Sequence, residues 1–156
     1  MADMASLIED FVNRRVWAVV GVSTDPAKFG YRVFRSLREA GYRVYGVNPN
    51  AREIDGEAIY PSLAALPERP EVVDIVVPPA VTEQIVRECA ELGLCRVWMQ
   101  PGAESEAAIR FCQEHGIAVV YGACAMVEKR RWPAASINRE EDHGSPGAAS
   151  GPGGGV

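Results

Sequence analysis

A glycine-bounded loop that carries hydroxyl and amine side chains follows the first apolar run of the sequence. It reads GVSTDPAKFG, from Gly21 to Gly30. Gly21 allows a sharp turn, Ser23 and Thr24 offer hydroxyl groups and backbone donors, and a helix that follows would point its positive end at the loop. Lys28, one of two lysines among 16 basic residues, adds a point charge that suits a phosphate. The loop predicts a phosphate or diphosphate site; the alternative is a plain strand-to-helix turn with a solvated lysine.

Two common nucleotide-binding motifs are absent from this loop. Lys28 precedes Gly30, whereas the P-loop pattern G-x-x-x-x-G-K-[ST] places the lysine after the glycine. Ser23 occupies the position of the second glycine in the dinucleotide fingerprint. The second apolar run ends in Val47-Asn48-Pro49, without the acidic residue that holds the ribose of NAD. NAD binding is therefore disfavoured, although Arg52 leaves an opening for a 2′-phosphate.

A pair of prolines follows the third apolar run, in the segment Val77-Pro78-Pro79. Two prolines stiffen the chain and remove two backbone donors, which leaves a flat apolar surface on which a purine can rest. The alternative is that the prolines simply end a strand and begin a helix.

The two turns that complete this series contain no arrangement of residues that indicates catalysis. They span residues 99–102 and 122–128 and hold no Ser/His/Asp or paired-carboxylate set. Cys124 and Glu128 are the reactive types there, and each alone is more often structural. We therefore predict no catalytic residue. The four cysteines show no CxxC spacing, which predicts neither a metal site nor a disulfide framework.

The segments that must position these turns alternate between strand-like and helical patterns. Apolar runs predict strands at residues 16–22, 42–47, 72–77, 95–99 and 117–121, and helical spacing predicts helices at 31–40, 81–92 and 104–115. The helix at 81–92 has its apolar stripe at Val81, Ile85, Cys89 and Leu92. A further N-terminal helix, with apolar residues from Leu7 to Val12, is expected at the sheet edge. Within the proline-rich stretch 48–71 we expect only one short helix, at 62–66.

Regular alternation of strands and helices implies parallel pairing, because each connection must cross back over the sheet. We predict an α/β fold of Rossmann type: a doubly wound, mostly parallel five-stranded sheet with helices on both faces. In such sheets ligands bind outside the carboxyl ends of the strands, where the strand order reverses. The turns described above follow strand ends and would meet there.

Composition limits the class of protein further. The chain has 156 residues and a formal charge of −5, so we predict one domain, at 1–143, and no general electrostatic footprint for DNA or RNA. Residues 144–156 (GSPGAASGPGGGV) predict a disordered tail. No apolar run approaches the roughly 20 residues of a membrane span. An acidic N-terminus without an export signal and unpaired cysteines favour a cytoplasmic protein.

The turns taken together resemble those of the stand-alone CoA-binding protein family. More distantly they resemble the CoA-binding N-terminal domain of the succinyl-CoA synthetase alpha subunit and of ADP-forming acyl-CoA synthetases. The matching segments are GVSTDPAKFG (21–30), GVNPNAREIDGEAIYPSLAALP (46–67), DIVVPP (74–79), VWMQPGAESEAA (97–108) and GIAVVYGACAMVE (116–128). Ala125 departs from the family, many of whose members have a second sulfur-containing residue after the cysteine.

The resemblance implies that CoA lies across the carboxyl edge of the sheet. Its phosphates would meet Ser23, Thr24 and Lys28, and its adenine and ribose would meet Asn48, Pro49 and the turn at 77–79. Arg52 lies close to the position at which the synthetases carry a CoA-contacting lysine. The residues expected to bind CoA are Gly21, Val22, Ser23, Thr24, Lys28, Phe29, Gly30, Asn48, Pro49, Arg52, Val77, Pro78 and Pro79.

Three functions are consistent with these residues. The first is non-catalytic binding of CoA or acyl-CoA by a carrier, sensor or regulatory module. The phosphorylated histidine of the synthetases has no counterpart here, since His115 lies at a predicted helix end and His143 beside the tail. The second is an NADP-linked oxidoreductase or redox sensor on the same fold. The third is a thiol-reactive protein in which Cys124 exchanges with the CoA thiol.

Deleting residues 144–156 is expected to change neither the melting temperature nor the affinity for CoA, because the segment has no apolar face that can dock. Scanning and titration calorimetry of the shortened chain measure the two quantities. A clear loss of either would mean that the tail folds onto the domain.

Overall fold

The computed structural model describes residues 3–129; the predicted tail at 144–156 lies outside the described residues. The strands are β1 (Val16–Val20), β2 (Arg43–Val47), β3 (Glu53–Ile54), β4 (Glu57–Tyr60), β5 (Val72–Ile75), β6 (Arg96–Met99) and β7 (Ala118–Val120). The helices are α1 (Met4–Val12), α2 (Phe29–Glu39), α3 (Pro79–Leu92), α4 (Glu106–Glu114) and α5 (Ala125–Glu128), with one 3-10 turn, η1 (Leu63–Ala65). The fold class is the one predicted from the sequence.

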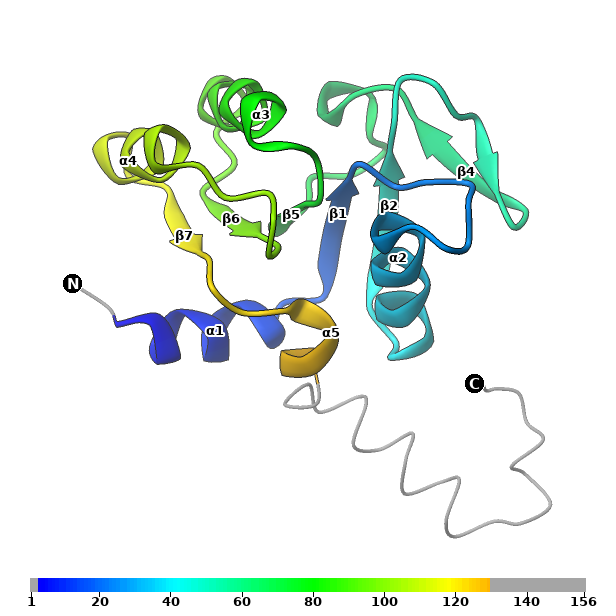
Figure 1. Cartoon of the computed structure of the whole chain (residues 1–156), viewed down its shortest axis with the longest axis horizontal. Coiled ribbons are helices and arrows are strands. Elements are labelled where there is room, and N and C mark those ends of the chain that lie inside the picture. The colour runs from blue at the N-terminus through cyan, green and yellow to red at the C-terminus, as the bar shows by residue number, and fades with distance from the viewer. Residues whose placement is uncertain (1–2, 130–156) are drawn as a thin grey trace, which may run out of the picture.

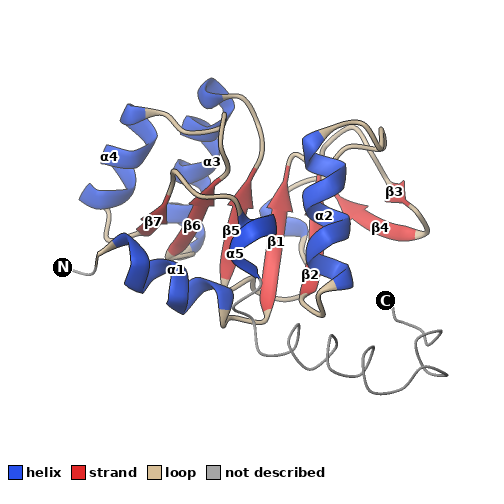
Figure 2. Ribbon diagram, turned by 60° about the horizontal axis from the view of Figure 1, so that its bottom comes forward, coloured by secondary structure: helices blue, strands red, loops and turns tan. Residues whose placement is uncertain are grey.

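The strands form one sheet in the order β3-β4-β2-β1-β5-β6-β7. Every neighbouring pair is parallel except β3 and β4, which are antiparallel. β1 lies between β2 and β5, so the chain winds outward from β1 in both directions and the strand order reverses there. Figure 2 shows the arrowheads of the parallel strands pointing the same way, and Figure 1 looks obliquely onto the edge where they end.

Each face of the sheet has its own hydrophobic core. α1, α2 and α5 cover one face, and α3 and α4 with η1 cover the other (Figure 2). The first core is centred on two fully buried indoles, Trp17 and Trp98, whose ring centroids are 5.8 Å apart. Phe11 of α1 packs against Trp98 at 6.2 Å, and α1 also contacts β7. The N-terminal helix therefore covers the sheet face beside its edge strand and contributes to the core.

The predicted number of strands was too low, because β3 and β4 form a hairpin inside the proline-rich stretch. Both turn residues, Asp55 and Gly56, have positive φ values, of 52° and 83°. An Asp-Gly pair is a strong signal for such a hairpin turn. The Tyr31 hydroxyl donates to Asp55 Oδ2 over 2.6 Å and so holds the hairpin against α2.

The buried stripe of α3 differs from the predicted one. Thr82, Val86 and Cys89 are its fully buried residues, whereas Val81 is 37% exposed. The Thr82 hydroxyl donates to the Pro78 carbonyl oxygen over 3.3 Å, which allows this polar side chain to face inward. Val81 is thereby left on the outside of the first helical turn, close to the carboxyl ends of the strands.

Gly30 makes a close contact between α2 and the loop after β1 possible. A Cβ at Gly30 would overlap the carbonyl oxygen of Gly21. Gly30→Ala is therefore expected to destabilise the protein by about 1–3 kcal/mol, the usual cost of overpacking. The direction of this change in stability is informative, because alanine is otherwise the better helix former by about 1 kcal/mol. Urea denaturation measures the change, and Arg32→Ala, at an exposed position of the same helix, is the control. A Gly30→Ala variant with unchanged or higher stability would contradict the contact.

Candidate functional site

The loop after β1 lies between the ends of two neighbouring strands. Gly21 has a φ of 105°, and its N–H donates to the Val47 carbonyl oxygen at the end of β2 over 2.9 Å. On its other side, a Cβ at Gly21 would stand 2.8 Å from Val77 Cγ1 and 2.9 Å from Val76 Cγ2, just beyond β5. Gly21 therefore sits at the point where the strand order reverses, and a side chain there would not fit.

The start of α2 presents its backbone donors to this loop. Lys28 is the N-cap residue, in an extended conformation, and makes no side-chain capping bond. The first turn of an 11-residue helix consequently keeps N–H groups that no capping side chain satisfies. These groups, with the helix dipole, favour an anion. The exposed amine of Lys28 and the exposed hydroxyl of Thr24 belong to the same loop.

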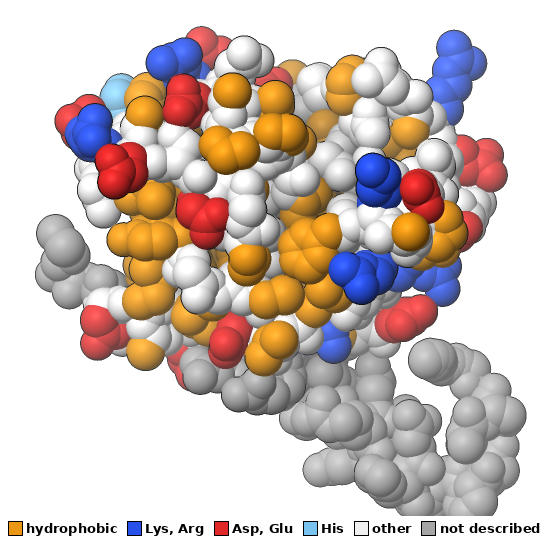
Figure 3. Space-filling view, in the orientation of Figure 1, with side chains coloured by type: hydrophobic (Ala, Val, Ile, Leu, Met, Phe, Trp, Pro, Cys, Tyr) orange, Lys and Arg blue, Asp and Glu red, His pale blue; other side chains and the backbone are white. Residues whose placement is uncertain are grey.

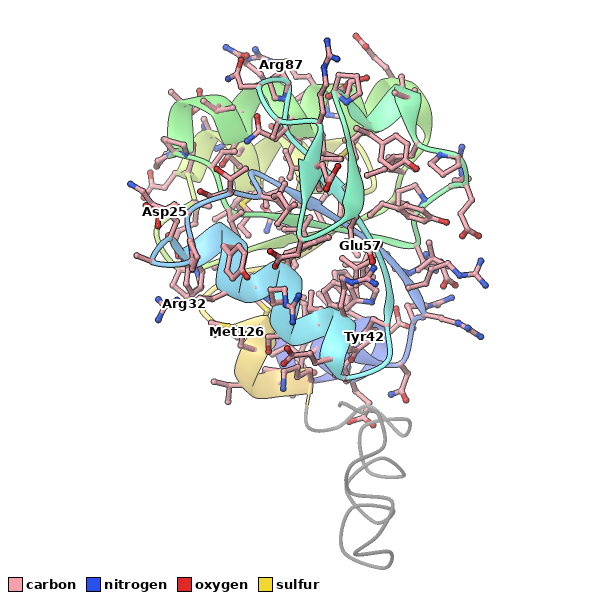
Figure 4. All side chains as sticks on the ribbon, turned by 90° about the vertical axis from the view of Figure 1, so that its right-hand side faces the viewer. Asp25, Arg32, Tyr42, Glu57, Arg87 and Met126 are labelled. Carbon is pink, nitrogen blue, oxygen red and sulfur yellow. The ribbon has the colours of Figure 1, made fainter. Side chains whose placement is uncertain are left out.

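Two other loop side chains hold the backbone in shape. Ser23 Oγ accepts from the Asp25 N–H over 3.0 Å, and Asp25 Oδ1 accepts from the Ala27 N–H over 2.9 Å. Figure 4 shows Asp25 beside the first turn of α2. Ser23 still has its hydroxyl hydrogen to donate. Its hydrogen bond makes it part of the loop's framework as well as a predicted phosphate contact.

Asn48 joins the turn after β2 to the loop after β1. Its Nδ2 donates to the Val22 carbonyl oxygen over 2.7 Å, and its Oδ1 accepts from the Asn50 N–H over 2.7 Å. Its own N–H donates to Tyr60 of β4 over 2.9 Å. Both ends of the amide are thus engaged within the protein, and Asn48 fastens the two loops together. Pro49 and Arg52, further along the turn, are exposed.

The segment after β5 supplies an apolar surface at the same edge. Val76 and Val77 are half-buried against Gly21, and Pro78, Pro79 and Ala80 are exposed. Figure 3 shows hydrophobic side chains along the seam between the half of the molecule that carries α3 and the half that carries α2. The contact of this surface with a purine stays a prediction.

The structure brings the three turns together through four of the predicted residues, because Gly21 lies against Val77 as well as the end of β2, and Asn48 contacts Val22. Phe29 and Arg52, which are also predicted to bind CoA, make their contacts elsewhere. Phe29 is half-buried against the core of the α2 face, with the Arg32 guanidinium 5.8 Å from its ring centroid. Arg52 accepts a backbone hydrogen bond from Ile59 within the hairpin. Their predicted contacts with CoA remain predictions.

A buried polar chain that the sequence analysis missed ties the last turn of this edge to the sheet. Gln100 Nε2 donates to Asp74 Oδ1 over 2.5 Å, and Gln100 Oε1 accepts from the Ala125 N–H over 3.2 Å. Trp98 Nε1 donates to the Ala123 carbonyl oxygen over 2.9 Å. The half-buried Cys124 is held between these two attachments. The available signal was a single acid, Asp74, within the apolar run VVDIVV.

Asp74 is the most strongly perturbed carboxyl of this region. Complete burial raises its pKa from the ordinary 3.8 to about 7, and the hydrogen bond from Gln100 opposes that rise. Its Oδ2 has no hydrogen-bond partner among the described residues. The folded protein therefore favours the neutral acid at this position.

The cysteines differ in their access to solvent. Cys89 and Cys112 are fully buried, and burial raises the pKa of each thiol to about 12. Cys95 is exposed and Cys124 is half-buried. Within residues 3–129, no cluster of three His, Cys, Asp or Glu side chains has the arrangement of a metal site. No helix of that same part of the chain is long and apolar enough to cross a membrane.

Comparison with known proteins agrees with this geometry. A family model described as a CoA binding domain matches residues 15–130. The alpha subunit of acetate–CoA ligase [ADP-forming] II from Pyrococcus furiosus is 39% identical over 89 residues, which is 56% of this chain and 20% of that subunit. A conserved hypothetical protein from Pyrococcus furiosus has a solved structure with 43% identity and a TM-score of 0.71, covering 73% of this chain and 98% of that one. A hypothetical protein from Pyrococcus horikoshii gives 32% identity and a TM-score of 0.77, covering 83% and 92%.

The parallel sheet, with a glycine loop and an uncapped helix start where the strand order reverses, defines a Rossmann-type nucleotide-binding domain. Within that class the chain belongs to the CoA-binding domain family. The resemblance that the sequence motifs indicated is thereby confirmed. The match with the ligase subunit spans only one fifth of that subunit's length.

Ionisation of Asp74 is expected to make the protein less stable as the pH rises. The folded-state pKa, about 7, exceeds the ordinary value of 3.8, so the contribution of the neutral acid is complete below pH 4 and is lost as the pH passes through 7. Asp74→Asn keeps an acceptor for Gln100 but cannot ionise, so its free energy of unfolding should decline less between pH 5 and about 8. Urea denaturation across this range measures both slopes; parallel slopes would contradict the assignment.

Proposed function

We propose that this protein binds CoA or an acyl-CoA across the carboxyl edge of its sheet and serves as a carrier, sensor or regulatory module without chemistry of its own. The observation that carries the proposal is the position of Gly21, pressed between the ends of β2 and β5 and facing the uncapped start of α2. Membership of the CoA-binding domain family supports CoA as the ligand.

Each part of CoA has a matching surface in this arrangement. The diphosphate would lie against the loop at 21–30, where Thr24, Lys28 and the first turn of α2 offer donors and a positive charge. The adenine would rest on the apolar turn at 77–79, and Pro49 and Arg52 would flank the ribose with its phosphate. The pantetheine chain would then run along the edge toward the loop that holds Cys124.

The alternative function, an NADP-linked oxidoreductase or redox sensor, uses the same fold and the same edge. Against it stand the absence of an acidic residue at the end of β2 and the engagement of Asn48 in hydrogen bonds to Val22 and Asn50. The name of the ligase relative, whose alpha subunit shares the domain, also favours CoA. Attack of the Cys124 thiol on the disulfide of oxidised CoA would give a mixed disulfide and release one CoA thiol; this reaction would be an addition to CoA binding and stays a prediction.

Titration calorimetry with CoA, NAD and NADP separates these functions. We expect saturable binding of CoA and no comparable binding of either dinucleotide. Affinity for NAD or NADP equal to that for CoA would contradict the proposal.

Lys28→Ala is expected to weaken CoA binding roughly ten- to a hundredfold, because a hydrogen bond to a charged group contributes about 1.5–3 kcal/mol. The melting temperature should be nearly unchanged, since Lys28 is exposed and forms no salt bridge among the described residues. Lys129→Ala, which changes the other lysine of the chain, is the matched control and should bind CoA normally. Normal CoA affinity in Lys28→Ala would show that Lys28 is only a solvated loop residue.

A further inference from the structure

A hollow lies on the flank of the sheet that is remote from the carboxyl edge. Its volume is about 350 Å³, and its lining includes the guanidinium-bearing residues Arg15, Arg38 and Arg43. They come from three elements: the segment before β1, the last turns of α2 and the first residue of β2. We refer to this space, between the amino-terminal half of β2 and the start of β4, as the arginine hollow.

The hollow exists because β4 separates from β2 toward its own start. The two strands pair only at Gly46 with Ile59 and at Val47 with Tyr60. The backbone N–H of Asn48 donates to Tyr60 and so points toward β4. Because backbone polar groups alternate in direction along a strand, those of Val44, four residues earlier, also point toward β4. The ladder does not reach Val44, and Val44 lines the hollow. Backbone polar groups therefore face this space without a strand opposite them.

Side chains on both sides keep the gap open. An ion pair between Arg38 Nη2 and Glu57 Oε2, 2.8 Å long, holds the start of β4 toward α2. The rings of Tyr45 and Tyr60 meet edge to face with centroids 6.0 Å apart. All four of these residues line the hollow, and the Tyr60 hydroxyl forms no hydrogen bond within the described part of the chain.

Positive charge exceeds negative charge around the hollow, although the whole chain carries −5. Arg38 pairs with Glu57, and Arg43 Nη1 pairs with Glu68 Oε2 over 2.7 Å. Arg15 forms no salt bridge to any described residue. The pKa of the Glu68 carboxyl is lowered, mainly by the hydrogen bond from Arg43, and the charge of Arg15 adds to this lowering. Three guanidinium groups thus face two carboxylates, and one of the three has room for another anion.

We propose that the arginine hollow binds a small anion with two or more carboxylate or phosphate groups. Guanidinium groups bind both kinds of oxyanion through paired hydrogen bonds. The Tyr60 hydroxyl and the unpaired N–H of Val44 supply further donors. The volume is at the lower end of the roughly 300–1,000 Å³ that is typical of small-molecule sites, which suits a metabolite of few atoms better than a nucleotide.

This site is separate from the proposed CoA site and does not depend on it. Figure 4 shows α2 running between the two: Asp25 lies beside its first turn, and Glu57 and Tyr42 lie toward its other end. Of the residues predicted to bind CoA, none lines the arginine hollow. A ligand in the hollow and CoA at the carboxyl edge would be bound at the same time.

Titration calorimetry of the full chain with citrate, and separately with inorganic phosphate, tests the proposal. We expect saturable binding of citrate with one site per chain, and weaker binding of phosphate, which offers a single group. Arg15→Gln should weaken citrate binding about tenfold or more, the effect of losing a hydrogen bond to a charged group. Arg87→Gln removes an exposed arginine from α3, outside the hollow, and should leave citrate binding unchanged.

Tyr60→Phe provides a second variant that leaves every ion pair in place, and it should also weaken citrate binding. A melting temperature for each variant confirms folding. The proposal is overturned if citrate does not bind saturably, or if Arg15→Gln and Arg87→Gln weaken it equally, which would indicate diffuse charge. Displacement of citrate by CoA would likewise overturn it, because the anion would then occupy the carboxyl edge.

Discussion

The close approach of backbone at Gly21 is the constraint on which the arrangement of the carboxyl edge depends. Its φ is 105°, its N–H is bonded to the end of β2, and its Cα faces Val76 and Val77 with no space for a Cβ. Gly30 lies directly against the carbonyl oxygen of Gly21. Two glycines nine positions apart therefore set how near the first turn of α2 comes to the strand ends. A wider separation would move the helix donors away from any phosphate at this edge.

The rest of the sheet brings further turns to the same edge. Parallel strands place the turns after β1, β2 and β5 together, at the point where the strand order reverses. Two separate hydrophobic cores hold the helices on the two faces. The main polar exception in the sheet interior, Asp74 with Gln100, extends from β5 through β6 to the start of α5. The hydrogen bonds of Gln100 join Asp74 to the loop that contains Cys124. The position of this loop therefore depends on a side chain, Asp74, whose pKa is raised to about 7.

Sequence patterns predicted most of the sheet, since the runs VWAVV and VVDI are largely buried on both faces, as parallel strands require. The hairpin was missed because β3 and β4 have only two and four residues, too few to show periodicity among four prolines, although Asp55-Gly56 marked the turn. The inward turn of Thr82 depends on a hydrogen bond to Pro78 that residue spacing does not reveal. The arginine hollow joins Arg15, Arg38 and Arg43 through the divergence of two strands, a tertiary feature with no local signal.

Backbone amide NMR of the full chain during titration with CoA would show whether CoA binds at the carboxyl edge, because it reports binding and its location together. We expect CoA to shift the amide signals of the loop at 21–30, of Asn48 and of Val77, at the ends of β1, β2 and β5, and to leave those of Arg15 and Val44 in place. Shifts centred on the arginine hollow, or none at saturating CoA, would contradict the assignment of the carboxyl edge as the CoA site.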